Sequence, residues 1–116
     1  MEMDRKKLPD IFSYKDFRKF LDDYQKARHE IDDGFNKSSI CMRMGLEHSR
    51  SYFNDVLKGK KVTPGFVERF IPILELDSAE AEFFRVLVKF NQAENGNERD
   101  LYFRQLISLQ KTPKKI

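Results

Sequence analysis

The stretch KSSICMRMGLEHSRSYFNDVLKGKK, residues 37–61, decides the fold that the sequence predicts. It holds two short apolar runs with helical spacing, namely Ile40, Cys41 and Met44, then Phe53, Val56 and Leu57. Gly45 and Gly59 follow the two runs, where glycine commonly ends a helix in the left-handed backbone conformation. We therefore expect two short helices, about 37–44 and 49–58, joined by a tight turn. This is the pattern of a helix-turn-helix over residues 37–59.

An amphipathic helix is predicted before this stretch. Its apolar residues recur at spacings of three and four, and they are Phe17, Phe20, Leu21, Tyr24 and Ala27. Ser13 is placed to cap the free amides of this helix, with Asp16 at its third position. Residues 30–34, EIDDG, interrupt the helical pattern and predict a loop.

Further helices are predicted after it. Thr63 and Pro64 favour a helix start, whereas Pro72, inside the same apolar run, should kink or break that helix. Asp77 and Glu80 form a capping pair before a strongly apolar segment, residues 79–91. A last helix should cover about 98–109. Because no segment alternates with period two, the expected fold is all-α, a compact bundle of five to six helices.

Length and charge limit the possible classes of protein. The 116 residues suit one domain, which we place at residues 10–109 between a flexible N-terminus, 1–9, and a basic disordered tail, 110–116. The net charge of +3 is small, but residues 37–61 hold six basic and two acidic side chains, and residues 62–82 hold one basic and five acidic. This asymmetry points weakly to a surface that meets polyanions.

The cellular compartment is predicted from what the sequence lacks. Cys41 is the single cysteine, so an internal disulfide framework is excluded. No apolar run approaches the roughly 18 residues of a membrane span, and the first residues lack the apolar region of a signal peptide. We expect a cytoplasmic protein without membrane attachment.

The stretch GLEHSRSYFNDVLKGKKVTP, residues 45–64, resembles the recognition helix, closing glycine, basic loop and following helix of phage-repressor-like (XRE-type) regulators. Cys41, four residues before Gly45, matches the usual small residue, although the distance from Gly45 to Gly59 is about one residue longer than the common repressor spacing. The resemblance implies a lambda-repressor-like fold.

Over residues 10–109 the chain is more closely similar to the N-terminal part of a bacterial family expanded as paralogues in Fibrobacter. The matching segments are YKDFRKFLDDYQKAR, VLKGKKVTP and EAEFFRVLVKFNQAEN. Members of that family usually continue into a longer C-terminal region. The resemblance implies a role in transcriptional regulation and names no DNA target.

Candidate contacts to double-stranded DNA follow from this interpretation. Arginine pairs with guanine and asparagine with adenine in the major groove, so the candidates for reading bases are Arg50, Ser51 and Asn54. Candidates for contact with the DNA backbone are Lys37, Ser38, Arg43, His48, Ser49, Lys58, Lys60 and Lys61. Asp55 argues against the model, because phosphates repel a carboxylate. The alternative is a protein-interaction module that has this fold and does not bind DNA.

Other functions find little support in the sequence. It contains no Gly-rich phosphate loop, catalytic triad or two-histidine motif, so we expect neither an enzyme nor a cofactor. His29 and His48 lack partners at metal-ligand spacing, and no small-molecule ligand is evident. The helix over residues 79–91 is apolar on more than one face. It is either a central helix packed on two sides or an exposed surface. An exposed surface with Phe84 and Val88 would form a homodimer, or would be the surface that members of the resembled family cover with their C-terminal region.

Overall fold

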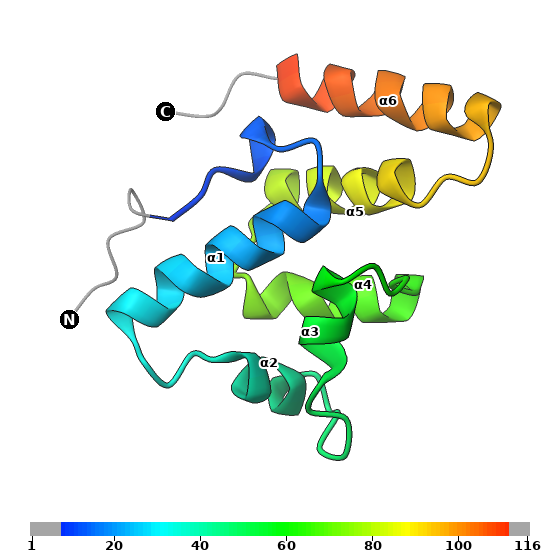
Figure 1. The fold of residues 1–116 in the computed structure, drawn as a ribbon. Coiled ribbons are helices and arrows are strands. Elements are labelled where there is room, and N and C mark those ends of the chain that lie inside the picture. Colours follow the sequence, from blue (N-terminus) through cyan, green and yellow to red (C-terminus); the bar gives the residue numbers. More distant parts are fainter. Residues whose placement is uncertain (1–7, 112–116) are drawn as a thin grey trace.

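Figure 1 shows a bundle of helices in the computed structural model, which describes residues 8–111. The elements are η2 (Ile11–Ser13), α1 (Phe17–Ile31), α2 (Lys37–Arg43), α3 (Tyr52–Leu57), α4 (Pro64–Ile73), α5 (Ser78–Asn91) and α6 (Gly96–Lys111). The described residues contain no strand. The predicted all-α bundle is therefore confirmed.

Helix α5 is the centre of the bundle. It contacts η2, α1, α4 and α6, and α6 runs antiparallel along it (Figure 1). The Phe84 ring lies 6.5 Å from the Phe17 ring and 6.2 Å from the Phe70 ring. Phe84 is 0% and Val88 2% exposed. The interpretation as a central helix is correct, and the exposed stripe on which we based a homodimer through this helix is absent, because α1 and α4 cover it.

Helix α1 begins later than predicted. Asp16 is its N-cap, and the carboxylate accepts from the amides of Arg18 at 2.9 Å and Lys19 at 3.4 Å. The prediction that Ser13 caps this helix is wrong, because Ser13 belongs to the short helix η2. Its hydroxyl donates to the carbonyl of Asp10 at 3.0 Å and is not directed at α1.

The caps predicted for α4 and α5 are confirmed. The Thr63 hydroxyl accepts from the helix amide of Phe66, and Asp77 and Glu80 form a reciprocal capping box. The expected kink or break at Pro72 takes the form of a helix end, since α4 stops one residue later. Pro72 lies in the last turn of α4. The amide hydrogen that proline lacks therefore removes a hydrogen bond only where the helix is about to end.

The two ends of the chain differ from the prediction at their boundaries. Leu8, assigned to a flexible N-terminus, packs against the core. Helix α6 begins two residues earlier than predicted and continues to Lys111, so the predicted tail cannot start at residue 110. Residues 1–7 and 112–116, which hold the remainder of both predicted flexible segments, lie outside the described residues.

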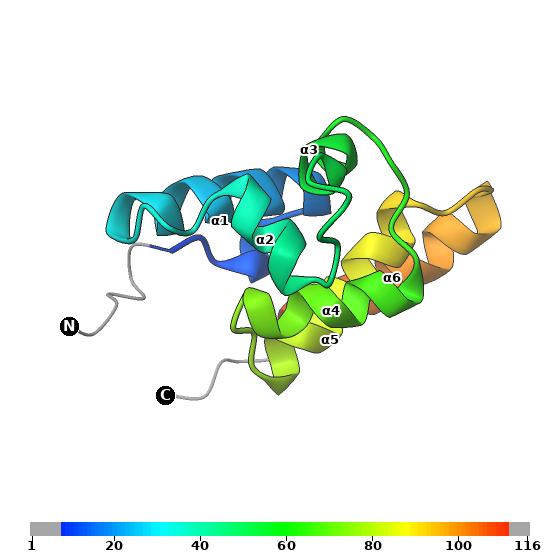
Figure 2. The same cartoon turned by 90° about the horizontal axis from the view of Figure 1, so that it is seen from below.

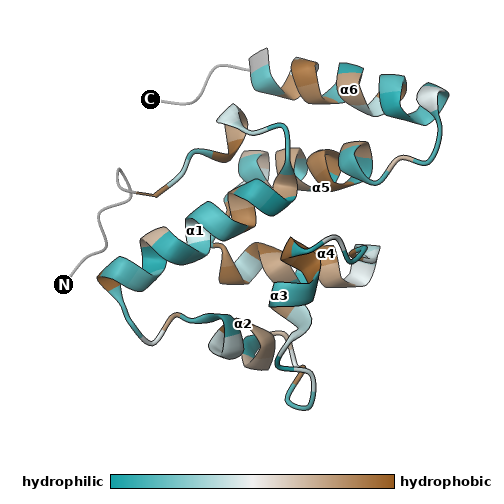
Figure 3. Ribbon diagram, in the orientation of Figure 1, coloured by the Kyte–Doolittle hydropathy of each residue, from teal (hydrophilic) through white to brown (hydrophobic). Residues whose placement is uncertain are grey.

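The helices differ in how hydrophobic their visible surfaces are. In Figure 3, hydrophilic residues cover most of the visible face of α1, whereas α5 shows several hydrophobic turns. Seven phenylalanines have less than 2% of their surface exposed: Phe17, Phe20, Phe35, Phe53, Phe70, Phe83 and Phe84. Within residues 8–111, none of the helices combines the length and the apolar character that crossing a membrane requires.

Candidate nucleic-acid interface

The two short helices α2 and α3, with the turn between them and the glycine after them, form the α2–α3 unit, residues 37–59. Both helices end in a Schellman motif around a glycine with positive φ, 80° at Gly45 and 124° at Gly59. In the first motif the amide of Leu46 donates to the carbonyl of Cys41 at 2.9 Å. In the second, the amide of Lys60 donates to the carbonyl of Asp55 at 3.0 Å. Both predicted helix ends are confirmed.

Cys41 connects the two helices from inside. The thiol is fully buried and donates to the carbonyl of Arg50 at 3.4 Å. It also accepts from the amide of Phe53 at 3.4 Å, one of the free donors at the start of α3. The small core residue that we predicted is therefore also a hydrogen-bonding partner for the start of α3.

Helix α3 is shorter than the predicted helix over residues 49–58. It begins at Tyr52, because the amide of Tyr52 turns back to the carbonyl of Ser49 at 3.1 Å and residues 49–51 form a turn. Ser49 is therefore not a helix-starting residue. His48 and Ser49 are both exposed in the turn that precedes α3.

The base-reading candidates gather around the start of α3. Arg50 and Ser51 are exposed directly before the helix, and Asn54 is half-buried on its first turn. The Ser51 hydroxyl donates to Asp55 Oδ2 at 3.2 Å. This hydroxyl thus already has an acceptor within the unit, and Arg50 and Asn54 are the better placed of the three for a new contact.

Apart from His48 and Ser49, the backbone-contact candidates divide between α2, at both of its ends, and the segment after α3. On α2, Lys37 and Ser38 are half-buried, and Arg43 is exposed with its guanidinium 5.3 Å from the Phe35 ring. Beyond α3 the exposed lysines are Lys58, Lys60 and Lys61. Figure 2 shows the loop that carries them as an extended segment between α3 and α4.

Lys61 differs from the other two lysines because it is already paired. Its ammonium lies 2.7 Å from Glu94 Oε2, after the end of α5, and both side chains are largely exposed. This hydrogen bond holds the pKa of Glu94 below its usual value. A phosphate that binds Lys61 therefore competes with Glu94 for the ammonium. Arg50, Lys58 and Lys60 form no ion pair with any residue that the structure describes.

Two arginines that sequence reasoning missed bind the carbonyl ends of the short helices. Arg18 on α1 donates from Nε to the carbonyl of Val56 at 2.8 Å, and from Nη2 to those of Gly59 at 3.1 Å and Lys60 at 2.9 Å. Arg69 on α4 donates to the carbonyl of Met44 at 2.7 Å. Positive charge at a helix C-terminus is favourable. Each arginine lies at least 25 residues from its acceptors, so no local pattern reveals it.

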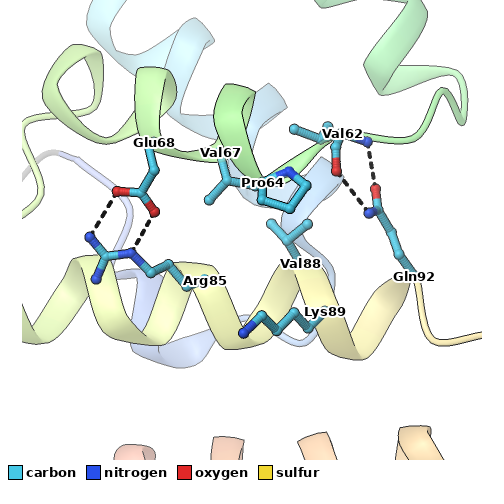
Figure 4. A pocket seen from close by; sticks show the side chains of 8 residues that line it. All are labelled: Val62, Pro64, Val67, Glu68, Arg85, Val88, Lys89 and Gln92. Carbon is cyan, nitrogen blue, oxygen red and sulfur yellow. Dashed lines mark hydrogen bonds and ion pairs between the residues drawn. The ribbon is translucent and has the colours of Figure 1, made fainter.

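Gln92 is a third residue that the sequence did not reveal. Its amide oxygen accepts from the amide of Val62 at 2.8 Å, and its amide nitrogen donates to the carbonyl of Val62 at 3.0 Å. Figure 4 shows the side chain reaching from α5 to this loop residue.

Tyr52 is the first residue of α3. Burial raises the pKa of its phenol, so the hydroxyl stays neutral.

A small pocket of about 200 Å³ lies between α4 and α5 beside this loop (Figure 4). Its apolar walls are Val62, Pro64, Val67 and Val88. The polar groups at its ends bond each other, since Arg85 contacts both carboxylate oxygens of Glu68, at 2.7 and 3.0 Å, and Gln92 holds Val62. Among the described residues, no three His, Cys, Asp or Glu side chains are grouped to hold a metal ion.

Comparisons with protein-family models, curated proteins and solved structures found no significant match to this chain. The resemblance to phage-repressor-like regulators therefore stays a prediction.

Proposed function

We propose that this chain is a sequence-specific DNA-binding regulator of transcription that inserts α3, with the turn before it, into the major groove. The observation that carries the proposal is the placement of exposed cations at both ends of α3. Arg50 precedes the helix, whereas Lys58 and Lys60 follow it, and none of the three has an ionic partner among the described residues. The opposite face, with Phe53 and Val56, is buried.

The proposed division of labour follows from the position of each group. Residues near the start of a recognition helix reach base edges, so Arg50 and Asn54 would read sequence. Lysines in the following loop would bind phosphates and position the protein. The six residues of α3 are about 9 Å long, within the roughly 12 Å width of the major groove. Two copies of the chain would read successive grooves of a palindromic site.

Selection of binding sites from random duplex DNA tests the proposal, followed by two substitutions. Asn54→Ala should cost about 1–3 kcal/mol on the selected site and leave nonspecific affinity and salt dependence nearly unchanged. Replacing Lys60 and Lys61 together by alanine should weaken binding to every sequence. It should also lower the slope of log affinity against log salt by nearly 2, at about 0.9 for each phosphate contact.

The matched control replaces Arg99 and Arg104 on α6 by alanine, which removes the same net charge from the far side of α5 (Figure 1). This control should change the salt slope little. Recovery of no reproducible site, or a lysine pair that behaves like the control, would place the recognition surface elsewhere.

A protein-interaction module remains the second candidate, because two carboxylates, Asp55 and Glu94, reduce the positive charge of the surface. Asp55 is exposed on α3 and bonded to Ser51, and Glu94 neutralises Lys61. A folded chain that binds no duplex at low salt would favour this candidate.

A further inference from the structure

The loop between α3 and α4, residues 59–62, is held at its backbone from two sides. Arg18 of α1 binds the carbonyls of Gly59 and Lys60, and Gln92, the C-cap of α5, binds both the amide and the carbonyl of Val62. The anchored residues thus lie on either side of Lys61, and the side chains of Lys60 and Lys61 are exposed. Neither anchor belongs to the α2–α3 unit.

We propose that Arg18 and Gln92 are positioning residues that hold the loop over residues 59–62 in its phosphate-binding conformation before DNA arrives. This inference rests on the proposed function. It explains how the loop would increase the affinity for DNA without adding further positive charges. Ordering a flexible loop on binding would cost conformational entropy, and a loop fixed in advance avoids most of that cost.

The geometry of each anchor favours positioning over a direct contact. The guanidinium of Arg18 uses two nitrogens on three carbonyls, a fork that a lysine ammonium cannot reproduce. The carboxamide of Gln92 uses its acceptor and its donor on the same residue, so its bonds satisfy the backbone of Val62 completely. Val62 is itself buried, at 3% exposed, which fixes the end of the loop in the core.

Two substitutions that preserve charge test the inference, Arg18→Lys and Gln92→Met. The matched controls are Arg104→Lys and Gln105→Met at exposed positions of α6. Affinity for a mixed-sequence duplex of 20 base pairs is measured over a range of salt concentrations, and amide hydrogen exchange is measured without DNA. We expect each test variant to bind roughly fivefold more weakly, with an unchanged salt slope, because the lysines remain but must be ordered.

Hydrogen exchange supplies the readout that reports on the loop alone. Gln92→Met should speed exchange of the Val62 amide by about tenfold or more and leave the amides of α5 protected, since only the loop loses its acceptor. The controls should leave affinity and exchange unchanged.

The possible failures are distinguishable. A wild-type chain that binds no duplex rejects the proposed function and the role of the loop together. Wild-type binding that survives both substitutions rejects the positioning role alone. Arg18→Gln, which removes the charge as well, should also leave the salt slope unchanged, whereas a slope lowered by about 0.9 would make Arg18 a phosphate contact and would overturn the inference.

Discussion

The exposed pair between Lys61 and Glu94 sets the charge that the loop after α3 presents to a polyanion. The Nζ and Oε2 atoms are 2.7 Å apart. Exposed pairs of this kind add little stability, so the consequence of the pair is electrostatic competition with a phosphate.

Glu94→Gln should therefore strengthen binding to all DNA sequences and leave the salt slope nearly unchanged, since Lys61 keeps its phosphate contact but no longer has to give up Glu94 to make it. Titration of a mixed-sequence duplex at several salt concentrations measures both quantities. Glu68→Gln is the control, because it removes an exposed acid on α4 that pairs with Arg85 of α5. Unchanged affinity in Glu94→Gln would mean that Lys61 does not reach a phosphate.

At the scale of single elements, the two glycines with positive φ can be tested against an ordinary helical glycine. Gly59 has φ 124°, and an added Cβ would meet nothing within 4 Å. Gly65, in the first turn of α4, also has open space but no positive φ. The two positions therefore differ in backbone conformation and not in crowding.

Gly59→Ala should destabilise the fold by about 1–2 kcal/mol, because the left-handed conformation is costly for a residue with a Cβ. Gly65→Ala should instead stabilise it by roughly 0.4–1 kcal/mol, because alanine restricts the unfolded chain and suits a helix. Urea unfolding of both variants measures the two differences. Changes of the same sign would show that backbone conformation does not distinguish the two sites.

The elements that the sequence predicted well are those whose signals are local. Gly45, Gly59, Thr63 and the Asp77–Glu80 pair act within four residues of their own helix, and the structure confirms them. The prediction that Ser13 caps α1 was wrong because the chain first turns through η2. Asp16, which is also a good N-cap residue and lies three residues later, caps α1 instead. The start of α3 depends on a hydrogen bond that the Phe53 amide donates to the distant Cys41 sulfur, so periodicity placed the start too early.

At the candidate site, the sequence predicted which charged side chains are exposed but not which residues form hydrogen bonds with each other. Arg50, Lys58 and Lys60 are exposed as expected. The bonds made by Arg18 and Gln92 connect residues 30 to 42 positions apart. Such contacts arise from the packing of α1 and the end of α5 against the loop, and a single sequence holds no signal for them.

Across the whole molecule, the aromatic core joins the candidate interface to α5. The Phe17 ring packs edge-to-face on the Phe84 ring, and the Phe17 amide donates to Asn91 Oδ1 at 2.7 Å. The next residue, Arg18, holds the end of α3. The orientation of α3 therefore depends on how firmly the first turn of α1 is fixed to α5.

Phe84 is the residue on which this connection depends most, since its ring contacts both α1 and α4 and has no exposed surface. Phe84→Ala should destabilise the chain by about 3–5 kcal/mol, a large part of the 5–15 kcal/mol typical of a domain. Phe103→Ala, at a ring that is 40% exposed, should cost clearly less. Urea unfolding gives the energies, and sedimentation shows whether either variant alters association. If Phe84→Ala left the stability nearly unchanged but abolished self-association, Phe84 would belong to a dimer surface. That result would contradict its central place in the core.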